Sequence, residues 1–301
     1  GERGAQPTQP GLGVRAGWVG QHADRWSGNG APTCLASWVH GSVAGWPGLV
    51  DNTWSGLTLA GQGLVYGREP SLAVQAALAR ISADVYQEPE TFEARMAQQG
   101  IDLRKWWCRA GTQAALVECG EWAALVFRGT QLTSGHPRER LRDWSVNLRI
   151  QTTRWSGPGR VHAGYLAALK RVRYEAREFA EAVSASKPIY VTGHSLGGAL
   201  ASGYAAWVSY THVCDVTPHH VAGLVTFGAP KFGTAKAMRP LYEKVPAVRW
   251  VRGQDVAPTW VPWFRCPRPG LERLPGGTAQ PRAVRDHDAH GYADALAARA
   301  V

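Results

Sequence analysis

The chain has 301 residues, 45% of them hydrophobic and 19% charged, so it can bury a substantial core without metals or disulfides to hold it together. Lys and Arg number 33 against 23 Asp and Glu, a net charge of +10 that favours anionic partners such as nucleic acid or an anionic lipid surface, or simply reflects a basic solvated surface. We expect neither a transmembrane segment nor a nucleic-acid partner, because no apolar stretch approaches the ~20 residues of a membrane span and no recognition motif or basic block is present.

The cysteines are scattered, with no Cys-x-x-Cys and no histidine pair at the spacing of metal ligands. We therefore expect no structural zinc and no disulfide framework, although the odd number leaves at least one thiol outside intramolecular pairs. The five are Cys34, Cys108, Cys119, Cys214 and Cys266.

The first ten residues are polar and lack the apolar region of a signal peptide. Since the chain begins with Gly rather than Met, an export signal would have been removed with the missing start. We expect a secreted or extracytoplasmic protein, with no signal peptide in this chain.

Residues 1–69 are rich in Gly, Ser, Trp and Asn and show little periodicity, which indicates an N-terminal extension before a domain over residues 70–301. Its tryptophans either form a surface for lipid or carbohydrate or, the interpretation we favour, pack against the following domain. They are Trp18, Trp26, Trp38, Trp46 and Trp54, the last three at equal spacing.

The first legible element is a helix capped by Ser71, whose apolar residues fall on one face: Val74, Leu78, Ile81 and Val85. A second short helix is expected over residues 90–98, stopped by Gly100. Two β-rich runs, 112–117 and 122–127, predict a hairpin.

A long amphipathic helix is predicted next, marked by Leu166, Leu169, Val172, Phe179 and Val183. Strands and helices then alternate over residues 188–192, 196–209, 221–227, 234–242 and 247–251, before a terminal helix. This alternation predicts an α/β fold in which helices cover both faces of a mostly parallel sheet and ligands bind outside the carboxyl ends of its strands.

Residues 193–197 read Gly-His-Ser-Leu-Gly between a predicted strand and a predicted helix. The two glycines leave room for a strained backbone and for close packing of strand and helix, so the serine is exposed to substrate. Ser195 is therefore a candidate nucleophile, which needs a base to accept its proton and a carboxylate to orient that base.

Asp255 follows the strand over 247–251 and fits the chain order Ser, Asp, His. Asp215 comes too soon after the nucleophile and is interpreted as a helix-end or turn residue. Two histidines before the terminal helix, His287 and His290, remain open as the base. Three other histidines are interpreted as surface or hydrogen-bonded residues rather than as the base: His194, His219 and His220.

A tetrahedral intermediate also needs donors for its oxyanion. The backbone N–H of Leu196, directly after the nucleophile, is one candidate. Thr130, just past the strand that ends at residue 127, offers both an N–H and a hydroxyl as the second.

Taken in order, these motifs resemble the class 3, or fungal-type, lipase family of α/β-hydrolases, over about residue 71 to the end. Residues 1–69 match nothing in its pattern. The matching segments are Phe127-Arg128-Gly129-Thr130, Asp143-Trp144 with Asn147-Leu148, Val161-His162-Ala163-Gly164-Tyr165, Gly193-His194-Ser195-Leu196-Gly197-Gly198, Thr226-Phe227-Gly228-Ala229-Pro230, Asp255-Val256-Ala257-Pro258, and Asp286-His287 with Tyr292.

The resemblance implies an α/β-hydrolase fold with a lid segment, and a serine hydrolase that needs neither a metal nor an organic cofactor. It assigns the base to His287 and makes His162 structural. The expected activity is hydrolysis of acylglycerols or related lipid esters through an acyl-enzyme. In that reaction Ser195 is the nucleophile, Asp255 orients the base, and Thr130 and Leu196 bind the oxyanion.

Residues 131–150 are the expected lid, with an apolar stripe at Leu141, Trp144 and Leu148 that could face a lipid–water interface. Residues 131–141 are more charged than a strongly lipophilic lid, which favours an alternative, an esterase for soluble or cell-wall esters of the feruloyl type. The neighbours of the acid, Ala257, Trp260 and Trp263, also depart from the family pattern. A further alternative is a non-catalytic protein that binds lipid surfaces through its basic, Trp-rich surface.

Overall fold

The computed structural model describes residues 69–129, 151–184, 186–211, 221–259, 264, 271–276 and 283–300. Most of the expected N-terminal extension and the whole expected lid lie outside these residues. So do Thr130, Asp215, His219, His220, Trp260, Trp263 and three cysteines, Cys34, Cys214 and Cys266.

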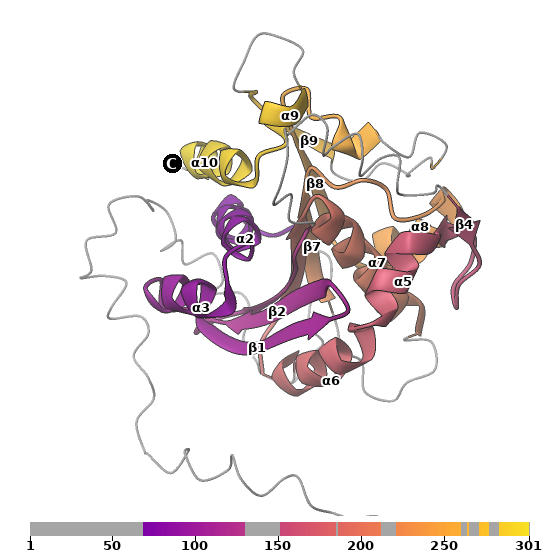
Figure 1. Ribbon diagram of the computed structural model, residues 1–301, viewed down its shortest axis with the longest axis horizontal. Coiled ribbons are helices and arrows are strands. Elements are labelled where there is room, and N and C mark those ends of the chain that lie inside the picture. Colours follow the sequence, from indigo (N-terminus) through magenta and orange to yellow (C-terminus); the bar gives the residue numbers. More distant parts are fainter. Residues whose placement is uncertain are drawn as a thin grey trace, which may run out of the picture. The chain divides into compact units, whose positions relative to one another are not determined.

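Seven strands of the described residues form one sheet, in the order β1-β2-β3-β6-β7-β8-β9 (Figure 1). All pairs from β3 onward are parallel, and only the β1–β2 and β2–β3 pairs are antiparallel, so the prediction of a mostly parallel sheet is confirmed. The strands are β1 (Asp102–Arg109), β2 (Thr112–Glu118), β3 (Ala123–Phe127), β6 (Ile189–His194), β7 (Val221–Phe227), β8 (Ala247–Arg252) and β9 (Leu271–Leu274). Two short strands, β4 (Thr152–Thr153) and β5 (Val161–His162), pair separately.

Helices cover both faces of the sheet, as the alternating pattern predicts (Figure 1). One face carries α2 (Leu72–Asp84), α3 (Pro89–Ala97) and α10 (Ala289–Ala300). The other carries α5 (Ala163–Lys170), α6 (Arg173–Ser184), α7 (Leu196–Thr211) and α8 (Ala235–Lys244). The short helices η3 (Ala257–Thr259) and α9 (Ala283–Asp286) flank the strand ends near the C-terminus.

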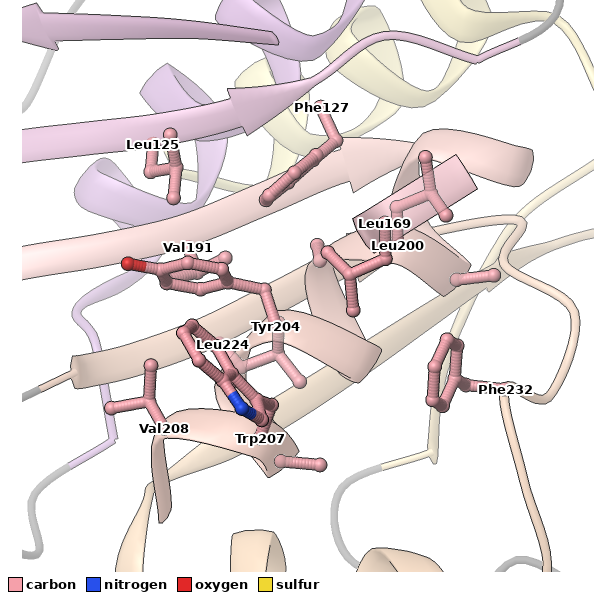
Figure 2. Packing of buried hydrophobic residues seen from close by; sticks show 14 of the residues in the cluster. Leu125, Phe127, Leu169, Val191, Leu200, Tyr204, Trp207, Val208, Leu224 and Phe232 are labelled. Atoms are coloured by element: carbon pink, nitrogen blue, oxygen red, sulfur yellow. The ribbon is translucent and has the colours of Figure 1, made fainter. Parts of the chain in front are cut away.

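Helix α7 is buried on nearly its whole circumference, because small residues let it lie close to the sheet. Figure 2 shows its large side chains, among them Tyr204 and Trp207, packed against Leu125, Val191 and Leu224 of the central strands. An added Cβ on Gly203 would overlap the ring of Phe232. The helix that begins at the candidate nucleophile is thus held rigidly against the strands.

Helix α2 forms as its sequence predicts. The Ser71 hydroxyl accepts a hydrogen bond from the N–H of Val74 at 3.3 Å, and the predicted apolar face is buried against the sheet. Tyr86 lies two residues past the end of this helix and contacts His194 beside the candidate nucleophile, so the packing of α2 positions part of the candidate active site.

Strands β1 and β9 and the break between α5 and α6 differ from the sequence-based expectation. Strand β1 is absent from the prediction because charged residues interrupt its apolar pattern, and β9 is too short and charged for a strand signal. The expected long helix is two helices, because the N–H groups of Arg171 and Val172 donate to carbonyls three residues back, those of Ala168 and Leu169, which ends the α-helical pattern of α5. Both helices present buried residues to one core, so the hydrophobic periodicity continues across the break.

Candidate active site

Ser195 stands on the sharp turn between β6 and α7, with a φ of +57°, where a residue with a Cβ is strained. Its N–H donates a 2.9 Å hydrogen bond to the Phe227 carbonyl, which fixes the turn to the end of β7. An added Cβ on Gly193 would lie 2.5 Å from the carbonyl carbon of Gly197, and one on Gly197 would overlap the Phe127 carbonyl oxygen. The two glycines are therefore required for strand and helix to meet at this turn.

The predicted nucleophile, base and acid lie in hydrogen-bond contact. His287 Nε2 is 2.8 Å from Ser195 Oγ, and His287 Nδ1 is 2.8 Å from Asp255 Oδ2. A carboxylate only accepts, so Nδ1 carries the proton and Nε2 accepts from the serine hydroxyl. Asp255 and His287 are buried, whereas Ser195 is half-buried and reachable. The contacts come from His287, not from His290, which belongs to α10.

Asp255 is held by further donors. The N–H of Ala257 donates to Oδ1 at 2.8 Å, and the Tyr292 hydroxyl donates to Oδ2 at 2.7 Å. That hydroxyl in turn accepts the N–H of Arg252, 2.9 Å away, at the end of β8. Burial, then the charge of Asp255, raises the pKa of Tyr292 above its usual range, so the phenol stays a donor.

Gly228, at the end of β7, leaves the space that the acid–base pair occupies. Its φ is +57°, and an added Cβ would lie 2.5 Å from Asp255 Oδ2 and 3.0 Å from His287 Nδ1. The sequence marks this glycine only as part of a matching motif, because the residues that crowd it are distant in the chain.

Asp286 joins the segment that carries the base to the segment that carries the acid. Its buried carboxylate accepts the N–H of Gln254 at 2.9 Å, and its other oxygen lies 3.7 Å from Arg252 Nη1. No sequence signal identifies this contact, since the partner is a backbone N–H more than thirty residues away.

His194, interpreted from the sequence as a surface or hydrogen-bonded residue, is buried and hydrogen-bonded. Its Nδ1 lies 3.0 Å from the Tyr86 hydroxyl, and its Nε2 lies 2.8 Å from the backbone carbonyl of His287. Burial, followed by the charges of His287 and His290, lowers the pKa of His194 well below its ordinary value, so the ring is neutral.

Leu196 begins α7, so its N–H is one of the first-turn donors that have no partner within the helix. Thr130, the other oxyanion candidate, lies outside the described residues, but the residues before it reach the nucleophile turn. An added Cβ on Gly129 would lie 2.9 Å from the carbonyl oxygen of His194. Arg128 fixes this strand end by donating to the Tyr86 carbonyl at 2.8 Å.

His162 is structural in its contacts. It caps α5 by accepting the N–H of Tyr165 at 3.3 Å and stacks on that ring, with 4.0 Å between the ring centroids.

The two described cysteines, Cys108 and Cys119, are free thiols. Over the described ranges, no cluster of three or more His, Cys, Asp or Glu side chains could hold a metal ion. No helix in the described part of the chain combines the length and apolar character needed to span a bilayer.

Comparison with known proteins adds an independent result. Residues 124–264 match the family described as Lipase (class 3). The fold is similar to the Rhizomucor miehei triacylglyceride lipase, with 22% identity and a TM-score of 0.56 over 71% of this chain and 83% of that one. A lipase from Rhizopus microsporus var. chinensis is 19% identical, with a TM-score of 0.54 over 78% and 84% of the two chains.

A third similar structure is a triacylglycerol lipase whose catalytic centre is a serine protease triad, with 21% identity and a TM-score of 0.51 over 67% of this chain and 78% of that one. No curated protein sequence matches the chain. The structural similarities establish the α/β-hydrolase fold. Residues 124–264, a segment that contains Ser195 and Asp255, are in addition similar to the class 3 lipase family.

Proposed function

We propose that this protein is a serine carboxylic ester hydrolase that cleaves acylglycerols or related lipid esters through an acyl-enzyme. The proposal depends on the two consecutive hydrogen bonds that connect Ser195 to His287 and His287 to Asp255. The family supports the lipid ester as substrate class, and the triad in a similar triacylglycerol lipase supports the serine mechanism.

In the first half of the reaction, Ser195 Oγ attacks the ester carbonyl carbon as its proton passes to His287 Nε2. Asp255 stabilises the resulting imidazolium. When the tetrahedral intermediate collapses, the imidazolium protonates the leaving alkoxide oxygen and the acyl group stays on Ser195. Water then attacks the acyl-enzyme as one of its protons passes to His287 Nε2. When the second tetrahedral intermediate collapses, the imidazolium returns that proton to Ser195 Oγ, which releases the carboxylic acid and restores the free serine.

The oxyanion of both tetrahedral intermediates would be bound by the backbone N–H groups of Leu196 and Thr130. The position of Leu196 at the start of α7 supports this role, because the positive end of a helix dipole favours a developing negative charge. For Thr130, the support is that Gly129, the residue before it in the chain, lies close to the carbonyl oxygen of His194.

Replacement of the nucleophile tests the chemistry directly. We expect Ser195→Ala to lower the turnover of a p-nitrophenyl ester by roughly 10⁴-fold or more, since the covalent step is lost. Ser186→Ala, at an exposed serine after α6, is the matched control and should keep the parent rate. An unchanged rate in Ser195→Ala would exclude Ser195 as the nucleophile.

The substrate class is tested by acyl-chain length. A lipase is expected to prefer long-chain triacylglycerol emulsions, and its rate should rise steeply above the solubility limit if residues 131–150 act as the lid expected from the sequence. The charged sequence of residues 131–141 favours the alternative, an esterase that prefers short or feruloyl esters and shows no such rise. Measuring both substrate series with the same preparation decides between them.

A further inference from the structure

Tyr86, His194 and the backbone of His287 form a buried chain of hydrogen bonds beside the catalytic line. Tyr86 follows the end of α2, and His194 is the last residue of β6, directly before Ser195. The Tyr86 hydroxyl lies 3.0 Å from His194 Nδ1, and His194 Nε2 lies 2.8 Å from the carbonyl oxygen of His287. The proposed mechanism uses neither side chain.

The chemistry of the partners fixes the protons in this chain. A carbonyl oxygen only accepts, so His194 Nε2 must carry the hydrogen. In the neutral ring Nδ1 then has a lone pair, which accepts the Tyr86 hydroxyl proton. Burial raises the pKa of Tyr86, so that hydroxyl remains a donor. Both ring nitrogens of His194 are therefore used.

We propose that Tyr86 and His194 are a positioning pair for the base, in which neutral His194 holds the main chain of His287 so that Nε2 points at Ser195. This inference rests on the proposed function, because it gives a role to groups that support the triad. Neither residue touches the reacting atoms.

The geometry explains why such a restraint is useful. His287 lies in a short connection between α9 and α10, and its ring is directed on one side by Asp255. His194 and Ser195 are consecutive at the end of β6, so the strand that presents the nucleophile also holds the base. The distance between nucleophile and base is thereby set by one rigid element.

The pair also has a required protonation state. A proton on His194 Nδ1 would displace the Tyr86 hydrogen bond and place a positive charge on a ring whose centroid is 4.6 Å from that of His287. The titratable groups that face His194 are Tyr86 after α2, His287, and His290 and Tyr292 on α10. None of these is a carboxylate that would stabilise the charged ring, so the neutral form is the one the site holds.

Tyr86→Phe removes a single hydroxyl and is the central test, with Tyr210→Phe at an exposed tyrosine of α7 as its control. We expect kcat to fall roughly tenfold with little change in KM, because the base is misplaced while substrate contacts remain. The acid limb of the kcat/KM profile should move to higher pH, since Nδ1 of His194 becomes free to take a proton. The low-field NMR signal of the His287 Nδ1 proton should shift or broaden.

Substitutions of His194 complete the experiment. His194→Gln can still donate an N–H toward the His287 carbonyl and has no titrating ring, so it should retain more activity than His194→Leu. Unchanged kcat, pH profile and NMR signal in Tyr86→Phe would overturn the positioning role. Fluorophosphonate labelling of the unmodified protein separates the two claims: without labelling of Ser195 the proposed function fails, whereas labelling with an unaffected Tyr86→Phe overturns only the pair.

Discussion

Ser195 holds a φ of +57°, in the left-handed region that costs a residue with a Cβ about 1–2 kcal/mol. The surrounding structure keeps it there through the hydrogen bond to Phe227 and the close packing of Gly193 against Gly197. The rigid turn between β6 and α7 thus holds Ser195 in a strained conformation that presents its side chain for reaction.

Gly228 lies against the acid–base pair, so its substitution should affect catalysis. Gly228→Ala should lower kcat on the order of a hundredfold, because its Cβ would occupy the space of the hydrogen bond between Asp255 and His287. The backbone strain alone should cost about 1 kcal/mol of unfolding free energy.

Gly111→Ala is the matched control for that variant. Gly111 also has a positive φ, +81°, but an added Cβ there meets nothing within 4 Å. Urea unfolding should show a similar cost of backbone strain in both variants. Ester turnover should fall only in Gly228→Ala. Full activity of Gly228→Ala would contradict the described packing around the acid–base pair.

Among the elements, those with a regular pattern are predictable from the sequence. The capped amphipathic helix α2, the β2–β3 hairpin and the strand–turn–helix around Ser195 all follow from local signals. Strand β1 does not, since it lies at the sheet edge, and its irregular register near Leu103 removes the clean alternation that marks a strand.

The turn between β1 and β2 also lacks the sequence signal that usually marks a two-residue hairpin. Its central residues, Ala110 and Gly111, both have positive φ, which is the two-residue hairpin geometry that normally favours Asn-Gly. Alanine gives no indication of that conformation.

This leads to a prediction of increased stability. Ala110→Asn should raise the unfolding free energy by about 0.5–1 kcal/mol, because asparagine tolerates the left-handed conformation that Ala110 holds at a φ of +46°. Urea unfolding measures the change, and ester turnover should stay the same because the turn carries no site residue. A less stable Ala110→Asn protein would contradict the assigned turn.

At the scale of the whole molecule, the site joins residues that are far apart in the chain. The order of nucleophile, acid and base can be read from motifs, because each follows a strand or precedes a helix with its own signal. The supporting contacts of Tyr86, His194 and Asp286 cannot, since their partners meet only when α2, β6 and the C-terminal segments pack on one sheet.

Burial of neutral His194 also predicts how stability depends on pH. Its pKa is lowered in the folded protein, so below the ordinary value of about 6.5 the unfolded chain binds a proton that the folded chain does not. Above that pH, the titration of His194 therefore does not reduce the free energy of unfolding. Below it, the free energy of unfolding falls with pH, by up to about 1.4 kcal/mol per pH unit.

Urea unfolding between pH 7.5 and 5.5 measures this slope. His194→Gln removes the titrating group, so its unfolding free energy should decline less steeply on acidification than that of the unmodified protein. Equal slopes in the two proteins would show that His194 takes up its proton in the folded state.

Labelling with a fluorophosphonate, with the adduct located by mass spectrometry, determines whether Ser195 is an activated nucleophile. We predict about one equivalent of label, on the peptide that contains Ser195, and none in Ser195→Ala. Absence of labelling in the unmodified protein, or label on a different residue, would contradict this role of Ser195.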